Sequence, residues 1–396
     1  MNKKQTLIFF SIMALFNLAA NYVHPVTPTY FKVLNLDNSM FGSAFAAMAL
    51  GMFLLSPFWG KINDLINSKT TILISSIGYA LSQIIFATAI NSDMIIVSRI
   101  LAGLTCGGAY VSFLTYTINM SKEADKARNL TINATLQSVA AAFGYFIGGM
   151  LGEVNIYLAM YLQIIQLGLS GILFYLFLKP DNFSNHKKSI KVILKESNPL
   201  RAFKQCGTFM TISFACLFLV STLSFLGYTA FDQCFNYYLK DIFLLSSGYN
   251  GIIKAAIGLI SLIANMTVCI YLMKHTDINK STIIVLLLCS LLMFGAIQVN
   301  QLSIYIIINV LYFGVYAISV PLIQDVIARS GDASISNLVM GFYQATKSLG
   351  LIIGAYLAGL LYTYNPKYPF VLGTISFLIA SVFAYIYYHK TKEKLR

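Results

Sequence analysis

Three basic residues lie inside long apolar stretches of the chain, where a charge needs a reason. They are Arg99, Lys254 and Lys347, and Lys347 stands about ten residues into its stretch. A charged side chain at the centre of a membrane costs at least ~2.5–3.5 kcal/mol on insertion scales, so it usually faces a cavity and marks function. The Lys347 ammonium therefore implies an acidic partner or an anionic substrate. The chemistry this pattern favours is the binding of a charged solute.

Asp232 and His24 have the side-chain types that suit proton exchange. Asp232 lies toward the outer end of its apolar stretch, and His24 takes the matching place in the first stretch. An imidazole exchanges protons near neutral pH. Glu153 is a second acid, expected at the boundary between lipid and water. We therefore expect proton coupling to involve Asp232, His24 or Glu153.

Other kinds of site find little support in the sequence. None of the six cysteines forms a CxxC pair, so a disulfide framework or a zinc site is not expected. The sequence contains no GxxxxGK[ST] loop, which argues against a nucleotide-driven pump. An intramembrane enzyme using His24, such as an acyltransferase, remains an alternative, although no second His or Cys stands at helical spacing from it.

The elements that position these residues must lie in lipid. Of the 396 residues, 58% are hydrophobic and only 10% are charged, whereas soluble domains carry about a quarter charged residues. A spanning helix needs ~20 apolar residues, and we predict an all-α integral membrane protein with twelve transmembrane helices. The predicted ranges are 7–29, 40–59, 70–90, 94–116, 129–151, 156–178, 207–231, 248–272, 282–299, 302–324, 336–361 and 370–388.

The polar segment 179–206 divides these helices into two sets of six. We predict an N-terminal bundle (1–178), a basic cytoplasmic linker (179–206) and a C-terminal bundle (207–396). With the N-terminus inside, 21 of the 27 Lys and Arg residues fall in cytoplasmic segments, and only Lys32, Lys240 and Lys367 in outer loops. This asymmetry predicts cytoplasmic N- and C-termini in a multi-pass protein of the cell membrane. It also removes the main argument for a nucleic-acid partner.

Polar residues at helical spacing mark one face of several predicted helices. In the eleventh range Tyr343 and Lys347 share a face with Gly350, and Gln344 is adjacent. Hydrogen bonding between helices is the more frequent role of any single polar residue in such a stripe. The candidates for substrate contact are Lys347, Gln344, Tyr343, Asn21, Gln137, Tyr228, Asn265, Tyr312 and Tyr316.

The two halves also repeat each other weakly. Residues 144–149, GYFIGG, match residues 350–355, GLIIGA, at corresponding places of the two sets. Two parallel six-helix halves with a solute site between them are typical of transporters. Glycines such as Gly144 and Gly148 stand four residues apart, which favours close helix packing as their main role.

The whole chain resembles the major facilitator superfamily in its layout of six plus six helices. Gly60, Asp64 and Lys69 resemble the first cytoplasmic signature of that family, which implies a gating latch on the cytoplasmic side. Asn67 replaces the usual second glycine of that signature, and Leu65 and Ser68 replace basic residues. The resemblance implies two pseudo-symmetric bundles.

Two further motifs carry the resemblance. Arg99 with Gly103 resembles the Arg-x-x-x-Gly motif, which implies a role for Arg99 in coupling or in holding the first helix. A structural alternative for Arg99 is bonding to carbonyls of the first helix. The GYFIGG run, with Gly144, Gly148 and Gly149, resembles the Gly-Pro-x-x-Gly-Gly pattern of proton-driven drug antiporters, with Tyr145 in place of the proline.

These observations predict a secondary transporter of small molecules that works by alternating access. The expected subtype is proton-coupled efflux of amphipathic or drug-like compounds, by a monomer in the lipid bilayer. The alternative is an uptake or exchange transporter for organic anions or metabolites. We expect no cofactor and no metal, and a proton gradient as the energy source.

Overall fold

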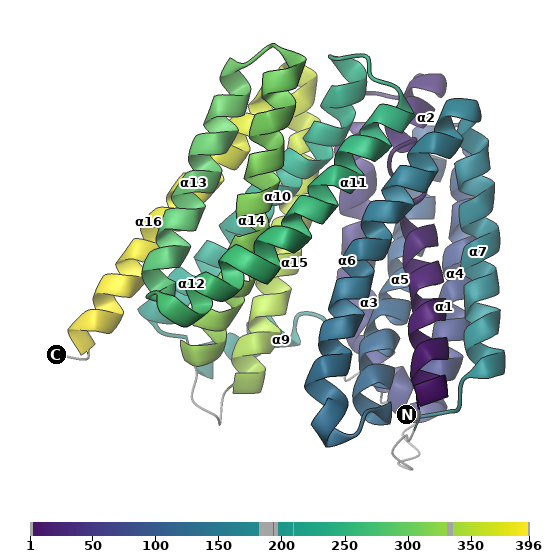
Figure 1. Ribbon diagram of the computed structural model, residues 1–396, viewed down its shortest axis with the longest axis horizontal. Coiled ribbons are helices and arrows are strands. Elements are labelled where there is room, and N and C mark those ends of the chain that lie inside the picture. Colours follow the sequence, from purple (N-terminus) through teal and green to yellow (C-terminus); the bar gives the residue numbers. More distant parts are fainter. Residues whose placement is uncertain (1–2, 182–192, 194–196, 209, 331–335, 395–396) are drawn as a thin grey trace. The chain divides into compact units, whose positions relative to one another are not determined.

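The computed structural model describes residues 3–181, 193, 197–208, 210–330 and 336–394, and within them every regular element is a helix (Figure 1). The predicted all-α class is confirmed. The α-helices are α1 (Lys3–Asn21), α2 (Thr27–Val33), α3 (Met40–Ile66), α4 (Ser68–Ala87), α5 (Ser92–Met120), α6 (Glu123–Val154), α7 (Ile156–Phe177), α9 (Arg201–Gln205), α10 (Ile212–Asp241), α11 (Ser247–Ala264), α12 (Ile270–His275), α13 (Ile278–Gln298), α14 (Leu302–Ser330), α15 (Ser336–Tyr364) and α16 (Tyr368–Lys394).

Eleven helical stretches of the described residues are long and apolar enough to cross a membrane. They correspond to eleven of the twelve predicted ranges. The remaining range, 7–29, is occupied by α1, a short turn and α2. Pro28 stands at the start of α2, and proline lacks the N–H that would continue a helix. The two prolines of this region, Pro25 and Pro28, explain why the predicted single helix is divided.

The predicted range 248–272 also differs from one regular helix. A π-helical segment, Asn265–Cys269, separates α11 from α12. Such π segments are rare in proteins, and those that occur often lie at functional sites. Hydropathy could not reveal this segment, because the prediction of a spanning helix rests on the average over the whole stretch, which stays apolar despite Asn265 and Thr267.

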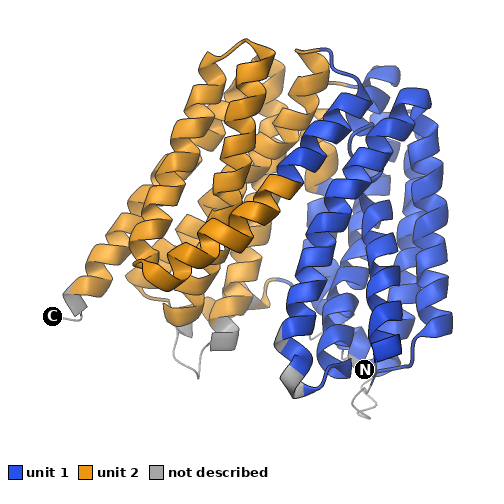
Figure 2. Cartoon of the chain, in the orientation of Figure 1, with its two compact units in different colours: residues 1–36, 47–199, 244–258 blue, residues 37–46, 200–243, 259–396 orange. Residues whose placement is uncertain are grey.

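The described chain divides into two compact units (Figure 2). Unit 1 comprises residues 1–36, 47–199 and 244–258, and unit 2 comprises 37–46, 200–243 and 259–396. The main boundary, between 199 and 200, lies inside the predicted linker. However, the start of α3 groups with unit 2 and the first part of α11 groups with unit 1. The predicted division into bundles 1–178 and 207–396 stays a prediction.

The core of unit 1 is built around α1. Phe16 from α1 meets Phe113 of α5 with ring centroids 5.0 Å apart, and Phe113 meets Phe174 of α7 at 5.2 Å. All three side chains are fully buried. Aromatic pairs at these distances add to the free energy of burial, so this cluster fixes α1 against α5 and α7.

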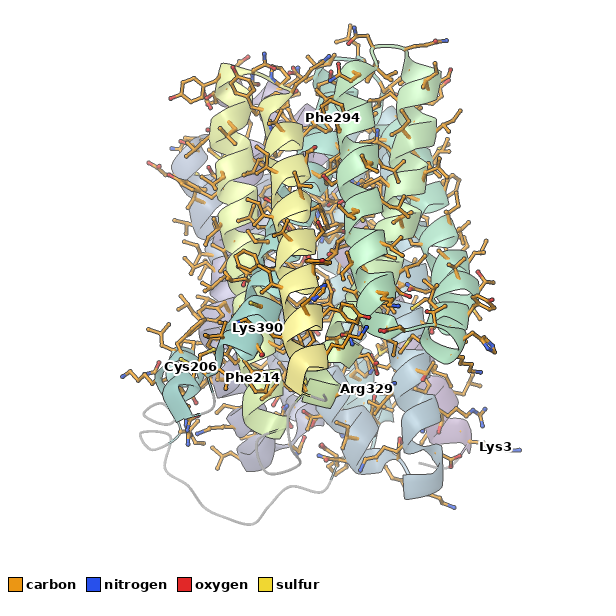
Figure 3. All side chains as sticks on the ribbon, turned by 90° about the vertical axis from the view of Figure 1, so that its left-hand side faces the viewer. Lys3, Cys206, Phe214, Phe294, Arg329 and Lys390 are labelled. Carbon is orange, nitrogen blue, oxygen red and sulfur yellow. The ribbon has the colours of Figure 1, made fainter. Side chains whose placement is uncertain are left out.

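In unit 2, α10 is the central helix and packs against α15 and α16. Phe231 of α10 contacts Tyr312 of α14 at 4.3 Å and Phe370 of α16 at 5.1 Å between ring centroids. Figure 3 shows Lys390 and Arg329 toward one end of these helices and Phe294 toward the other. These two basic residues thus lie toward the same end of unit 2.

Candidate functional site

Four tyrosines of the predicted substrate set come together in unit 2. The rings of Tyr228 on α10 and Tyr316 on α14 are parallel, with centroids 4.1 Å apart and an interplanar angle of 5°. Tyr312 lies one turn earlier on α14, 6.2 Å from Tyr316. Tyr343 of α15 interacts electrostatically with Tyr316. Spacing of four residues on α14 places Tyr312 and Tyr316 on one face, so three helices form one aromatic wall.

Two of these tyrosines carry hydroxyl groups without a partner. Among the described residues, the hydroxyls of Tyr312 and Tyr343 are buried and make no hydrogen bond, and their side chains are 0% and 1% exposed. A buried polar group without a partner costs about 1–3 kcal/mol. These hydroxyls could therefore bind a ligand that brings its own acceptors.

Lys347 lies one turn beyond Tyr343 on α15 and is half-buried. Its Nζ atom stands 4.9 Å from the ring centroid of Phe225 on α10. Within the described part of the chain, Lys347 forms no ion pair. Gln344, on the same helix, is exposed. The acidic protein partner that the sequence left open for Lys347 is thus not found among these residues.

Asp232 belongs to the same unit. It is half-buried on α10, and one of its carboxylate oxygens accepts a hydrogen bond of 3.2 Å from the Gln233 amide. It also interacts electrostatically with Tyr312 and Tyr316.

Asn265 begins the π segment of unit 2. Its side-chain oxygen is buried and, among the described residues, has no hydrogen-bond partner. Asn265 therefore combines an unsatisfied buried acceptor with a helix irregularity of the kind that is frequent at functional sites.

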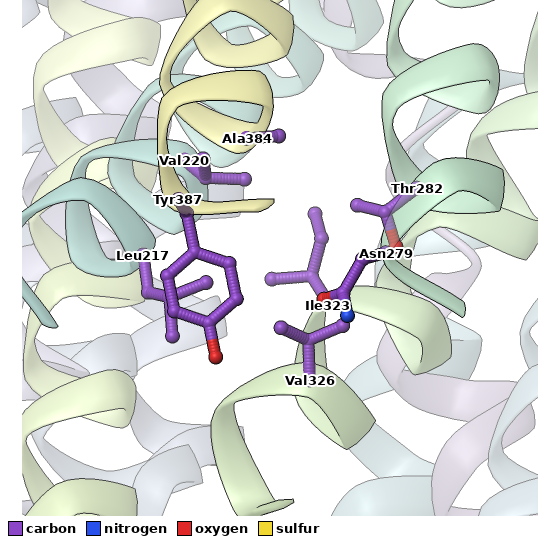
Figure 4. A pocket seen from close by; sticks show the side chains of 8 residues that line it. All are labelled: Leu217, Val220, Asn279, Thr282, Ile323, Val326, Ala384 and Tyr387. Carbon is purple, nitrogen blue, oxygen red and sulfur yellow. The ribbon is translucent and has the colours of Figure 1, made fainter. Parts of the chain in front are cut away.

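A small pocket lies elsewhere in unit 2 (Figure 4). It has room for about one water molecule, and none of the predicted substrate residues lines it. The lining residues come from α10, α13, α14 and α16 and are Leu217, Val220, Asn279, Thr282, Ile323, Val326, Ala384 and Tyr387.

In unit 1, His24 and Lys254 meet at the ring of Tyr145. The imidazole stacks on Tyr145 with centroids 5.4 Å apart and an angle of 13°, and Lys254 Nζ lies 5.9 Å from the same ring. Lys254 is buried, with 7% of its surface exposed. His24 and Lys254 were candidate functional residues from the sequence, whereas Tyr145 was only a replacement for proline. The signal that could have identified Tyr145 is an aromatic residue inside a glycine run.

Arg99 on α5 is buried and packs on an aromatic face. Its guanidinium carbon stands 3.7 Å from the ring centroid of Phe86, at the end of α4. The Tyr30 hydroxyl donates to the backbone carbonyls of Phe86 and Ala89, at 2.9 and 3.1 Å. Within the described residues, no hydrogen bond joins Arg99 to the carbonyls of α1. Cation–π packing therefore replaces the backbone bonding considered for this residue.

Glu153 caps a helix in unit 1. Its carboxylate accepts a hydrogen bond from the backbone N–H of Gly248, in the first turn of α11. The hydroxyls of Thr29 and Ser247 are 3.1 Å apart beside it. A negative charge at a helix N-terminus is stabilising, so Glu153 fastens the first turn of α11 to α6.

Asn21 and Gln137 use their amide groups within the protein. Asn21 donates to the carbonyl of Asn17 at 2.8 Å, one turn earlier on α1. Gln137 donates to Asn133 at 2.6 Å, and Asn133 donates to Thr117 on α5 at 2.9 Å. The bond between Asn133 and Thr117 holds α6 against α5. This is the structural role that polar residues between membrane helices often have.

The glycines of the GYFIGG run lie where α6 approaches other backbones. A Cβ atom on Gly148 would stand 1.9 Å from the carbonyl oxygen of Tyr22, and one on Gly144 would stand 2.5 Å from that of Leu18. On another face of α6, a Cβ on Gly149 would meet the carbonyl oxygen of Ser247 at 2.6 Å. These three glycines therefore allow close packing on two sides of one helix.

The predicted cytoplasmic latch is only partly described. Gly60 lies in open surroundings, with the nearest atom 4.0 Å from a built Cβ. The side chain of Asp64 lies outside the described part of the structure. Lys69 Nζ stands 4.7 Å from the ring centroid of Tyr175 on α7. Asn67, in place of a glycine, forms the whole connection between α3 and α4 with φ of 67°, a backbone region that favours glycine.

Outside the predicted spans, one acid has a perturbed pKa. Hydrogen bonds from the side chain and backbone of Ser39 lower the pKa of Asp37, which precedes α3.

Among the described residues, no three His, Cys, Asp or Glu side chains are grouped so that they could hold a metal ion. The arrangement as a whole offers aromatic stacking, hydroxyl donors, a cation and proton-exchanging groups.

The chain is similar in sequence to known bacterial proteins. The chain is 28% identical over 242 residues to "Quinolone resistance protein NorA" of Staphylococcus aureus, covering 61% of this chain and 60% of that protein. The chain thus spans about 60% of the length of these curated relatives. It is also 22% identical over 383 residues to "Multidrug resistance protein 2" of Bacillus subtilis, covering 93% of this chain and 92% of that one.

Solved structures show the same fold. The nucleoside transporter NupG matches with a TM-score of 0.80 at 13% identity, covering 97% of this chain and 99% of NupG. The human organic anion transporter MFSD10 matches with a TM-score of 0.68 at 18% identity, covering 96% of this chain and 99% of its own. The family model described as Major Facilitator Superfamily matches residues 7–336. This match extends over most of the chain, which therefore belongs to the major facilitator superfamily.

Proposed function

We propose that the protein is a secondary transporter that exports amphipathic aromatic compounds in exchange for protons. The observation that carries this proposal is the parallel stack of Tyr228 and Tyr316 in unit 2, near Tyr312 and Tyr343. Lys347 lies one turn beyond Tyr343, on the ring of Phe225. A stacked pair of rings offers flat apolar surface, and the free hydroxyls and the ammonium offer donors to the polar end of a substrate. The names of the two bacterial relatives also support drug efflux.

Proton coupling in this proposal rests on Asp232 and His24. The Asp232 carboxylate stands near the aromatic wall in unit 2, and His24 stacks on Tyr145 near Lys254 in unit 1. Each group can gain or lose a proton as its surroundings change. Glu153 is a weaker candidate for proton coupling, because its carboxylate already caps α11.

Flux into proteoliposomes with an imposed pH gradient tests both parts of the proposal. Wild type, Asp232→Asn and His24→Ala would be compared with the same aromatic fluorescent substrate. We expect gradient-driven transport in wild type and a loss of gradient dependence in at least one variant. Equal gradient dependence in all three proteins would refute the coupling assignment.

The aromatic wall has its own test. Tyr316→Leu removes the stacked ring at a position that is 7% exposed, whereas Tyr316→Phe keeps the ring and removes only the hydroxyl. We expect the leucine variant to lose affinity for aromatic substrates and the phenylalanine variant to retain it, since stacking is the main contribution. Similar affinity in both variants would contradict a stacking role.

A second candidate function is transport of organic anions or metabolites, by uptake or exchange. Lys347 favours it, because this half-buried cation has no ion-pair partner among the described residues. A panel of aromatic cations, zwitterions and carboxylates separates the two candidates. Transport restricted to the carboxylates, without dependence on a pH gradient, would favour the second.

The family is one of transporters, so the intramembrane-enzyme alternative based on His24 is excluded. The protein is a multi-pass membrane protein, and small molecules are its substrates. We further propose that it works as a monomer in the cell membrane with both termini in the cytoplasm. The gathering of Lys390 and Arg329 at one end of unit 2 supports this orientation (Figure 3).

A further inference from the structure

Two residues of the linker, to which the sequence analysis gave no role, are buried in unit 1. Asp181 is 3% exposed and Ile193 is 2% exposed. Residues in a long polar connection are expected to be solvated. The burial of one carboxylate and one aliphatic side chain in this connection needs specific partners.

Asp181 accepts three hydrogen bonds. Its Oδ1 atom accepts from the backbone N–H of Ser68 at 2.8 Å, and its Oδ2 atom accepts from the Ser68 hydroxyl at 2.6 Å and from the Asn119 amide at 2.9 Å. Ser68 is the first residue of α4 and Asn119 lies at the end of α5. The carboxylate thus caps a helix N-terminus, where negative charge is stabilising, and links it to a second helix.

The residues just before Asp181 are held in the same way. The Tyr116 hydroxyl of α5 donates to the carbonyl of Lys179 at 3.0 Å. The backbone N–H of Lys179 donates to the side chain of Gln5 on α1 at 3.3 Å. The chain after α7 is therefore fixed to α1, α4 and α5 as far as Asp181.

Ile193 provides a separate, apolar attachment. It forms a buried cluster with Trp59 and Ile62, both in the last turns of α3. Trp59 is 7% exposed, and its indole N–H donates to the carbonyl of Leu104 on α5 at 2.7 Å. Burying an isoleucine side chain contributes about 1.5–3 kcal/mol, so this contact holds the linker at a second point.

Both attachments converge on the turn between α3 and α4, because only Asn67 separates these helices. We propose that Asp181 and Ile193 dock the linker on this turn and act as positioning residues for transport. They set the place at which the chain leaves unit 1 on its way to unit 2. The docking itself is independent of the proposed substrate and coupling ion, and its first test, the fluorescence of Trp59, needs no transport.

Trp59 reports the apolar attachment directly, because it is the only tryptophan in the chain. In the purified full-length protein, Ile193→Ser should shift the Trp59 emission maximum to longer wavelength and increase its quenching by acrylamide. Leu200→Ser is the matched control, since Leu200 belongs to the same linker, lies in unit 2 and is 51% exposed. An unchanged emission and quenching in a folded Ile193→Ser protein would overturn this attachment.

A swap of two side chains tests the polar attachment. Asp181→Asn turns an acceptor toward the Asn119 amide into a donor, so two amide groups face each other. In the double variant Asp181→Asn with Asn119→Asp, a carboxylate again faces an amide. We expect the single variant to increase Trp59 quenching and to lower the maximal rate at which the aromatic fluorescent substrate is transported, because the hydrogen bond from the Asn119 amide to the charged carboxylate is lost. The swap should restore both.

The controls separate docking from general damage. Asp125→Asn removes an exposed acid on α6 and should change neither readout. An unchanged half-saturating substrate concentration in Asp181→Asn distinguishes positioning from substrate binding. If the single variant fails to fold, Asn119→Ala, which removes only one donor, takes its place. A folded swap variant without recovery, or Asp181→Asn identical to Asp125→Asn, would refute the proposal.

Discussion

At the scale of single residues, the proposed function makes Lys347 the residue that distinguishes charged from uncharged substrates. Replacing it by methionine keeps the length of the side chain and removes the charge. We expect Lys347→Met to reduce transport of aromatic carboxylates about ten-fold or more, because a hydrogen bond to a charged group is lost. Transport of uncharged amphipathic compounds should be nearly unchanged. Initial flux rates in proteoliposomes measure both.

The matched variant is Lys347→Arg, which retains the charge and should retain part of the carboxylate transport. An equal loss for charged and uncharged substrates in Lys347→Met would point to packing against Phe225 instead, since the lysine stands on that ring.

Asn67 is the second residue with a sharp expectation. Its φ of 67° favours glycine, yet its side chain accepts a hydrogen bond of 2.9 Å from the N–H of Thr70 and caps α4. Asn67→Ala loses the cap and adds backbone strain, which together should cost about 1–3 kcal/mol. Asn67→Gly loses the cap without the strain. We expect the thermal midpoint of Asn67→Gly to be close to that of wild type and the midpoint of Asn67→Ala to be clearly lower. Equal midpoints for the two variants would contradict a contribution from backbone strain.

At the scale of elements, the packing of α6 depends on Gly148. An added methyl group there would stand 1.9 Å from the carbonyl of Tyr22, which is backbone and cannot move aside cheaply. Gly148→Ala should therefore destabilise the protein by about 1–3 kcal/mol or more, as overpacking does. Thermal unfolding in detergent measures the effect.

Gly341 is the control within the same fold, because a Cβ atom there would meet nothing within 4 Å on the exposed face of α15. Gly341→Ala should be neutral or stabilising by about 0.5–1 kcal/mol, through the higher helix propensity of alanine. Equal destabilisation by both substitutions would argue against close approach as the reason for Gly148.

The elements themselves were largely predictable, and their irregularities were not. Long apolar stretches predict helices because lipid leaves no other partner for the backbone. The break at Pro25 and Pro28 in the first span was visible in the sequence, because proline lacks the N–H that continues a helix. The π segment at Asn265 depends on packing within unit 2. Likewise, helical spacing predicts which tyrosines share a face, but not that Tyr228 meets Tyr316.

At the scale of the whole molecule, the charge asymmetry predicts one orientation. A reporter protein that folds only in the cytoplasm should be active when it is fused after Arg396. A reporter that is active only outside the cell should be active when it is inserted beside Lys240. The reason is that basic residues near membrane helices are retained on the cytoplasmic side. The reverse pattern would overturn the predicted topology and with it the direction of the proposed export.

The exchange of two short segments between the units has a consequence for biogenesis. Unit 1 includes residues 244–258, which are synthesised after the linker and after α10. Until these residues emerge from the ribosome, the face of α6 that carries Gly149 has no packing partner from α11. The first bundle is therefore incomplete while it enters the membrane, and its maturation must wait for translation of the second. Two fragments divided at the linker should each be degraded when expressed alone and persist when expressed together.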